Sequence, residues 1–168
     1  MWAYRMFRLE PSAEYFDIIE RAWLNVNLSS VSLDGLMFFY ENMLRRTKKL
    51  DYELIWPLTR TDYLISYCCP PNIARMLAQS TEYAWFILRE DAKTPSDEYS
   101  PGLNRVGRAK TGIGTGLYGD NTVEFEDING GRVSIKETTA YPFDGRISFE
   151  IDAGTDFLLY LRFPGMVV

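Results

Sequence analysis

Residues 122–135 read Thr-Val-Glu-Phe-Glu-Asp-Ile-Asn-Gly-Gly-Arg-Val-Ser-Ile, and this stretch decides half of the fold. Val123 and Phe125 alternate with glutamates, which is the period of a strand that buries one face. Asn129-Gly130-Gly131 is typical of a tight hairpin turn, and the alternation resumes after it. The stretch therefore predicts two adjacent antiparallel strands.

Further strand signals follow toward the C-terminus. Ile147, Phe149 and Ile151 alternate with polar residues, and residues 157–163 form an apolar run that predicts a more buried strand. Four or five short strands at this spacing predict part of an antiparallel β-sandwich over residues 117–168.

The first half of the chain has helical periodicity instead. Ser12 is a candidate N-cap for a helix over residues 12–28, with Glu14 favourable in its first turn. Residues 1–9 resemble the end of another helix. Pro70-Pro71 opens a further helix, whose apolar positions continue as far as Ile87.

Two stretches interrupt this pattern. Asp34-Gly35 predicts a turn, followed by a strand over residues 36–40. Residues 89–116 are rich in glycine, proline and polar residues, and predict a linker or long loop. The run Gly112-Ile-Gly-Thr-Gly116 lacks the Gly-Lys-Ser/Thr ending of a phosphate-binding loop, which argues against nucleotide binding.

Composition excludes several classes of function. A formal net charge of -5 argues against nucleic acid as a partner, and no apolar run has the length of a membrane span. The chain contains no histidine, which excludes Ser-His-Asp triads, Cys-His pairs and histidine metal ligands. Acid–base chemistry must then come from carboxylates, tyrosines or lysines.

The two cysteines are adjacent, in Tyr67-Cys-Cys-Pro-Pro-Asn72. They directly precede a predicted helix, whose partial positive charge at the N-terminus favours thiolate over thiol. A thiolate can be a nucleophile or a soft metal ligand, but both cysteines could also be buried as small apolar residues. Two reduced thiols favour the cytoplasm over an oxidising compartment.

Several segments together resemble glycoside hydrolase family 127, the beta-L-arabinofuranosidases. They are residues 1–15, 19–25, 32–35, 38–42, 139–145 and 161–165, and above all Cys68-Cys-Pro-Pro-Asn-Ile-Ala-Arg75. The cysteine motif is the most specific of them. The match is poor at residues 44–62 and 88–116, the stretch before the cysteines lacks an expected Trp-Phe pair, and Pro164-Gly165-Met166 stands where the family continues with tryptophan.

The resemblance implies an α+β chain in two parts. Residues 1–88 would be the C-terminal helices of an (α/α)6-barrel catalytic domain, residues 89–116 a linker, and residues 117–168 the start of a β-sandwich. It also implies a retaining hydrolase of non-reducing-end beta-L-arabinofuranosides, with Cys68 as nucleophile and with Cys68 and Cys69 as zinc ligands. The family's other zinc ligands, in a Glu-Thr-Cys segment, and its acid/base glutamate would lie before Met1. The chain alone is therefore expected to be an inactive fragment of an enzyme whose substrate is a plant-type arabinose-containing glycan.

Two other functions stay open at this level. The β-rich half could be a non-catalytic carbohydrate-binding or interaction module that does not need the cysteines. The adjacent thiols could instead define a metal-binding or redox protein. Trp56, Tyr63 and Tyr67 could stack on a sugar, or simply anchor the loop before the cysteines.

Overall fold

The computed structural model describes residues 2–41, 57, 59–62, 68–89 and 111–165. Residues 90–110, the greater part of the predicted linker at 89–116, lie outside the described residues. The elements in chain order are α1 (Trp2–Leu9), α2 (Ala13–Ala22), the π-helical segment η1 (Trp23–Asn27), α3 (Leu28–Ser30), α4 (Pro70–Ala78), α5 (Ser80–Ala84), β1 (Trp85–Leu88), β2 (Gly112–Thr115), β3 (Asn121–Ile128), β4 (Gly131–Thr139), β5 (Ile147–Ala153) and β6 (Leu158–Leu161).

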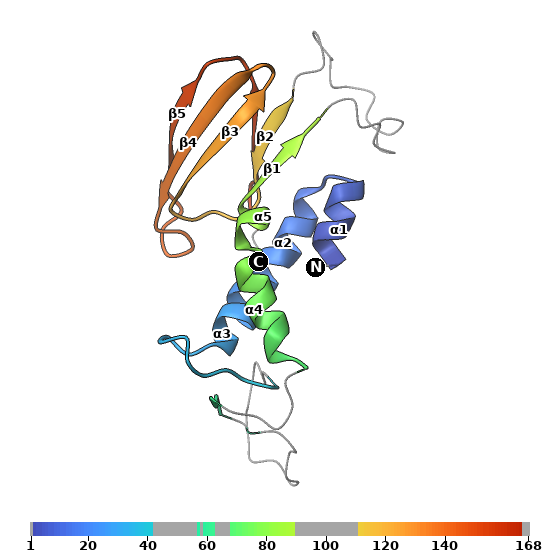
Figure 1. Ribbon diagram of the computed structural model, residues 1–168, viewed down its shortest axis with the longest axis vertical. Coiled ribbons are helices and arrows are strands. Elements are labelled where there is room, and N and C mark those ends of the chain that lie inside the picture. The colour runs from blue at the N-terminus through green and yellow to red at the C-terminus, as the bar shows by residue number, and fades with distance from the viewer. Residues whose placement is uncertain (1, 42–56, 58, 63–67, 90–110, 166–168) are drawn as a thin grey trace. The chain divides into compact units, whose positions relative to one another are not determined.

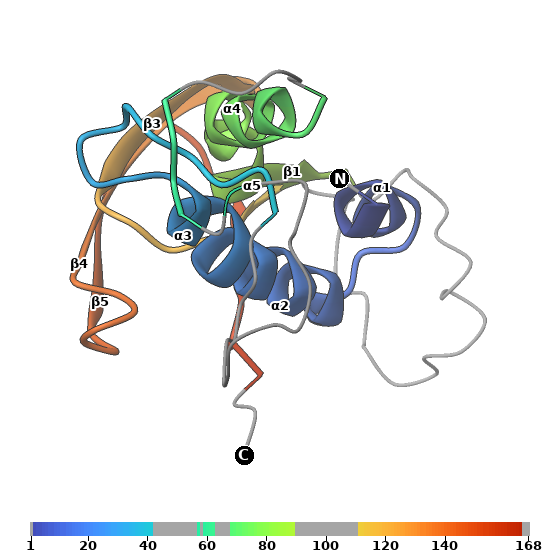
Figure 2. The same ribbon diagram turned by 90° about the horizontal axis from the view of Figure 1, so that it is seen from below.

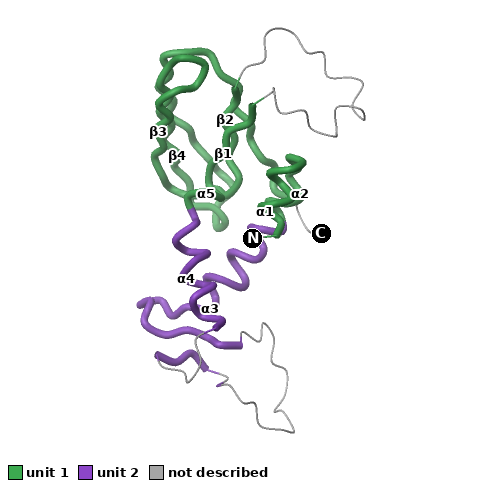
Figure 3. Tube along the Cα trace, turned by 45° about the vertical axis from the view of Figure 1, so that its right-hand side comes forward, with its two compact units in different colours: residues 1–17, 81–168 green, residues 18–80 purple. Residues whose placement is uncertain are grey.

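The chain is therefore a mixed α+β protein, as predicted. It divides into two compact units (Figure 3). Unit 1 contains residues 1–17 and 81–168, and unit 2 contains residues 18–80. The division into a barrel end, a linker and a sandwich start stays a prediction. No helix in the described part of the chain is long and apolar enough to cross a membrane.

Unit 1 contains two three-stranded sheets. One has the order β3-β4-β5, with both pairs antiparallel, and the other has the order β1-β2-β6 (Figure 1). β1 pairs with β2 antiparallel, whereas β2 pairs with β6 parallel, so the second sheet departs from the antiparallel arrangement predicted. Between the sheets lies an apolar cluster composed of Trp85, Ile113, Ile128, Val133 and Ile135.

The hairpin between β3 and β4 follows the sequence prediction. Asn129 and Gly130 both have positive φ, of 52° and 84°, as a two-residue turn of this hand requires. Val133 and Ile135 are fully buried, so the alternating residues face the core. The apolar run at residues 157–163 differs from its prediction, because β6 lies at a sheet edge and three of its four residues are exposed.

The glycine-rich stretch predicted as loop contains a strand. Gly112–Thr115 is β2, the central strand of its sheet, and all four residues are buried. A Cβ on Gly112 would overlap the Tyr160 ring, and one on Gly114 would overlap the Phe86 ring. The glycines therefore let aromatic rings lie directly on the strand backbone.

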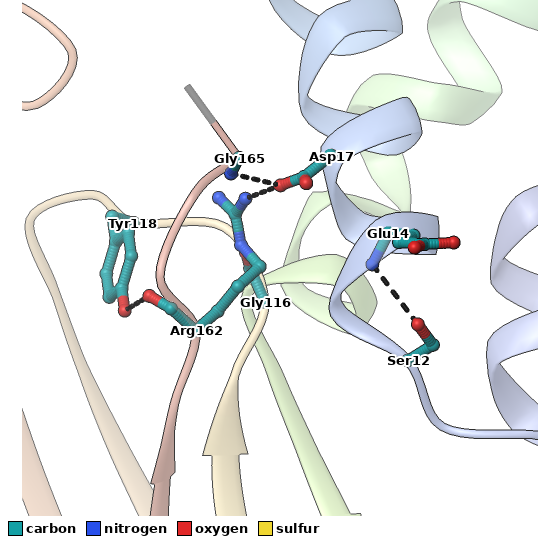
Figure 4. Close-up of polar contacts among 7 residues, drawn as sticks. All are labelled: Ser12, Glu14, Asp17, Gly116, Tyr118, Arg162 and Gly165. Atoms are coloured by element: carbon teal, nitrogen blue, oxygen red, sulfur yellow. Dashed lines mark hydrogen bonds and ion pairs between the residues drawn. The ribbon is translucent and has the colours of Figure 1, made fainter. Parts of the chain in front are cut away.

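The helix predicted from Pro70 to Ile87 is also shorter than expected. It ends at Ala78, and after the short α5 the chain becomes β1, with the sequence Trp-Phe-Ile-Leu. Aromatic and β-branched residues favour strands, and here they pair with β2. By contrast, the predicted helix starting at Ser12 is present, and the Ser12 hydroxyl accepts a hydrogen bond of 3.4 Å from the Glu14 N–H (Figure 4).

Unit 1 is also tied together by one buried ion pair, which joins the end of β6 to the first half of α2. The Arg162 side chain is 3% exposed, and its Nη1 lies 2.6 Å from Oδ1 of Asp17. Its Nε donates to the carbonyl of Gly116 at 2.6 Å, and the Gly165 N–H donates to the same Asp17 oxygen at 3.1 Å (Figure 4). The cation thus has both a counter-charge and a carbonyl acceptor, as a buried arginine needs.

Candidate active site

The candidate site lies in unit 2, where Cys68 and Cys69 precede α4. Cys69 is the N-cap residue, Pro70 occupies the first helical position, and α4 continues to Ala78. Proline is tolerated there because the first helical N–H groups have no acceptor within the helix. The sequence prediction of a helix starting at Pro70-Pro71 is confirmed, and the two thiols lie at its N-terminus.

Both cysteines are exposed and reduced. Their sulfurs lie 3.6 Å apart. The alternative that both are buried small apolar residues is therefore wrong, and their chemistry must be explained in another way.

Asn72 fixes the backbone that carries the two thiols. Its backbone N–H donates to the carbonyl of Cys69 at 2.9 Å, and its Nδ2 donates to the carbonyl of Cys68 at 3.1 Å. Nη1 of Arg75, one turn further along α4, donates to Oδ1 of Asn72 at 3.0 Å. A chain of side-chain hydrogen bonds thus connects Arg75 through Asn72 to the Cys68 carbonyl, and a backbone hydrogen bond from Asn72 holds the Cys69 carbonyl.

Tyr40 is a site residue that the sequence did not reveal. Its hydroxyl lies 2.7 Å from Sγ of Cys68, although the two residues are 28 positions apart. The loop that carries Tyr40 was predicted to contain a strand over residues 36–40, but it makes only isolated bridges, from Phe38 to Val31 and to Thr61. Only the motif Phe38-Phe-Tyr-Glu-Asn42 pointed to this segment, and nothing in it indicated a contact with the cysteines.

Local hydrogen bonds stabilise the turn before Tyr40. Gly35 has a φ of 75°, which confirms the Asp34-Gly35 turn. The Ser32 hydroxyl and the Leu36 N–H both donate to Oδ1 of Asp34, at 2.5 and 3.1 Å, and these hydrogen bonds hold the pKa of the Asp34 carboxyl below its usual value. The returning segment, blue to cyan in Figure 2, runs past α4, which is seen there nearly end-on.

The spacing of the sulfurs fits two corners of a zinc site. With Zn–S bonds of about 2.3 Å and tetrahedral angles, two thiolates are about 3.8 Å apart. The observed 3.6 Å needs only a small adjustment. Within the described ranges, no group of three or more Cys, His, Asp or Glu side chains comes together.

Trp56, Tyr63 and Tyr67 lie outside the described residues, so their predicted stacking on a sugar stays a prediction. Tyr141-Pro-Phe-Asp144 forms a turn between β4 and β5 in unit 1, and Phe143 in it is almost fully exposed.

The chain is similar to known proteins along most of its length. Residues 1–82 match the family model described as beta-L-arabinofuranosidase, GH127 catalytic domain. A non-reducing end beta-L-arabinofuranosidase from Bifidobacterium longum subsp. longum is 28% identical over 173 residues, which are 98% of this chain and 23% of that protein.

Two solved structures have a similar fold. One, described as a glycoside hydrolase, has a TM-score of 0.69 and 32% identity, and the match covers 89% of this chain and 21% of that one. The other is a GH127 beta-L-arabinofuranosidase from Geobacillus stearothermophilus, with a TM-score of 0.67 and 28% identity over 98% of this chain and 23% of that one.

The chain thus spans about a quarter or less of the length of the relatives it matches. The family match extends over both cysteines and Tyr40, so it includes the whole candidate site. Together, the family-model match, the curated relative and the solved structures support the chain as part of a glycoside hydrolase family 127 protein.

Proposed function

We propose that this chain is the part of a retaining beta-L-arabinofuranosidase that carries the nucleophile, Cys68. The observation that supports the proposal most directly is the exposed pair of thiols at the start of α4, with the sulfurs 3.6 Å apart. Cysteine is intrinsically a strong nucleophile once it is deprotonated, and an exposed sulfur can reach a substrate.

Each step of the proposed reaction uses the Cys68 sulfur. Its lone pair attacks the anomeric carbon of a non-reducing-end beta-L-arabinofuranoside, a C–S bond forms, and the bond to the leaving-group oxygen breaks. An acid protonates that oxygen. The deprotonated acid then takes a proton from water as the water oxygen attacks the same carbon, the C–S bond breaks, and the sugar leaves with its configuration retained.

The residues around Cys68 have separate roles in this proposal. Tyr40 orients the sulfur through its hydrogen bond, and Asn72 holds the backbone. Cys68 and Cys69 would hold a zinc ion together with ligands from outside the chain. When bound, zinc would keep the thiols deprotonated at neutral pH.

The proposal also holds that the chain by itself does not hydrolyse glycosides. The acid and the remaining zinc ligands are expected outside it, in the greater part of the matched enzymes that it does not cover. The substrate is proposed to be an arabinose-containing glycan of plant type, with no role for nucleic acid or membrane.

The test uses a chain extended upstream through the predicted Glu-Thr-Cys segment and an aryl beta-L-arabinofuranoside. Hydrolysis should stop in Cys68→Ser. Intact-protein mass spectrometry should detect one arabinosyl group bound to the wild type and none bound to the variant. Tyr40→Phe keeps both sulfurs, so it should still accept the sugar, with a lower kcat. Undiminished turnover by Cys68→Ser would rule out Cys68 as the nucleophile.

A further inference from the structure

The adjacent thiols could also bind a ligand that bonds to two protein sulfurs rather than four. A trivalent arsenical with one organic substituent is such a ligand, because the substituent fills its third position. We propose that Cys68 and Cys69 form a bidentate site for monosubstituted trivalent arsenicals. The site needs neither zinc nor a glycan, so it goes beyond the glycosidase function.

The observed spacing suits a bridging atom. An atom bonded to both sulfurs at about 2.3 Å, as in zinc thiolates, spans 3.6 Å with an S–X–S angle of about 103°, which is close to the pyramidal geometry of trivalent arsenic. A disulfide between the same residues would need the sulfurs to close to about 2.05 Å. The bridge therefore needs less movement than the disulfide.

The reaction is balanced without any oxidant. Phenylarsine oxide reacts with two thiols so that two As–S bonds form, the arsenic–oxygen bond breaks, and the oxygen leaves as water with both thiol protons. Arsenic stays trivalent throughout. A single thiol can form only one such bond, and the remaining As–OH group leaves that adduct easy to reverse.

The second As–S bond should form readily because the backbone is already ordered. The Asn72 side chain donates to the Cys68 carbonyl and is itself held by Arg75, while the Asn72 backbone N–H donates to the Cys69 carbonyl. Closing the ring therefore restricts side-chain torsions and little else, and such preorganisation increases affinity. The second thiol acts at a high effective concentration, which can increase affinity by about 10²–10⁴-fold over one thiol.

Exposure makes the site accessible. Both cysteines are exposed, and the half-buried Tyr40 places its hydroxyl 2.7 Å from the Cys68 sulfur. A small arsenical can therefore approach both sulfurs without any change in α4.

The experiment uses the whole chain, reduced and treated with a chelator, and phenylarsine oxide as the probe. Native mass spectrometry should find one phenylarsenic group per chain, with both thiols lost to a thiol reagent. The adduct should survive excess monothiol and be released by 1,2-ethanedithiol. In Cys68→Ser and Cys69→Ser, the same monothiol should remove the arsenic, and affinity should fall about 100-fold or more.

A second pair of variants tests preorganisation. Asn72→Ala should weaken binding about tenfold while keeping both thiols, whereas Asn25→Ala, also in unit 2, should change nothing. A wild-type adduct as labile to monothiol as that of Cys69→Ser would overturn the proposal. That outcome would leave the glycosidase proposal standing, because hydrolysis through Cys68 does not need a two-sulfur bridge to arsenic.

Discussion

Replacing Arg162 with methionine should destabilise unit 1 by about 3 kcal/mol, because breaking a buried ion pair leaves an uncompensated charge and usually costs about 3–5 kcal/mol. We take the lower end of that range because the Asp17 side chain is 24% exposed and can be partly rehydrated. The variant also leaves the Gly116 carbonyl without the Nε donor that lies 2.6 Å from it.

Asp17→Asn tests the charge separately from the shape. The amide oxygen can still accept from Arg162 and from the Gly165 N–H, so only the counter-charge is lost, and the expected cost is about 2 kcal/mol. In the double variant, Arg162→Met with Asp17→Asn, the loss of stability should be smaller than the sum of the two single losses. That shortfall measures the coupling between the two side chains.

Lys136 and Glu150 provide a matched control on the β4–β5 sheet. Their nitrogen and oxygen lie 3.0 Å apart, but the side chains are 53% and 73% exposed. Solvent and salt screen such a pair, so Lys136→Met should cost less than about 1 kcal/mol.

Hydrogen exchange measured by mass spectrometry across a urea series, on peptides covering β2 and β6, reports unfolding of unit 1 directly. The reasoning is refuted if Arg162→Met shifts the urea midpoint of these peptides no more than Lys136→Met does.

Three further predictions concern unit 1 and use the same readout. Thr115 is fully buried, and its hydroxyl has no hydrogen-bond partner among the described residues, so Thr115→Val should stabilise unit 1 by about 1 kcal/mol. Thr139→Val should destabilise it, because the Thr139 hydroxyl donates to the Arg146 carbonyl and accepts from the Tyr141 N–H. Equal effects of the two substitutions would contradict this account. Burial raises the pKa of the Glu137 carboxyl, so the stability that this group contributes is fully present below its pKa in the unfolded state and is lost as pH rises through its pKa in the folded state. Glu137→Gln should therefore flatten the pH dependence of the urea midpoint in that window, and an unchanged profile would contradict this prediction. Gly116→Ala would place a Cβ into the Phe16 ring and 2.5 Å from the Tyr83 carbonyl oxygen, so it should destabilise unit 1 by more than about 2 kcal/mol. The Cβ of Gly119→Ala meets no atom within 4 Å, so this control should cost little. Similar costs for the two variants would show that the Phe16 ring moves aside with little strain.

Local chemistry made part of the fold predictable. A serine before α2, two prolines at the start of α4 and an Asn-Gly turn between β3 and β4 each act over a few residues, and all three are present. The alternating residues of β3 and β4 were predictable for the same reason, since a period of two needs only one buried face.

The features that the sequence did not reveal depend on partners far along the chain. β1 has the composition of a strand but continues a helical pattern, and only its pairing with β2 decides between the two. β2 has the composition of a loop because the rings of Phe86 and Tyr160 lie where side chains would be. The contact between Tyr40 and Cys68 likewise joins residues 28 positions apart, so a motif could point to the proposed nucleophile but not to the hydroxyl beside it.

The different roles proposed for the two cysteines can be tested separately because the variants act on different atoms. The Asn72 side chain contacts the Cys68 carbonyl and not the sulfurs, so Asn72→Ala should weaken ring closure by an arsenical while leaving the rate at which iodoacetamide alkylates Cys68 unchanged. Cys69→Ser should also preserve alkylation of Cys68, yet it removes both the second arsenic bond and a proposed zinc ligand. A parallel loss of alkylation in either variant would mean that Cys68 depends on its neighbours for reactivity, and the separation between a nucleophile and a supporting ligand would then fail.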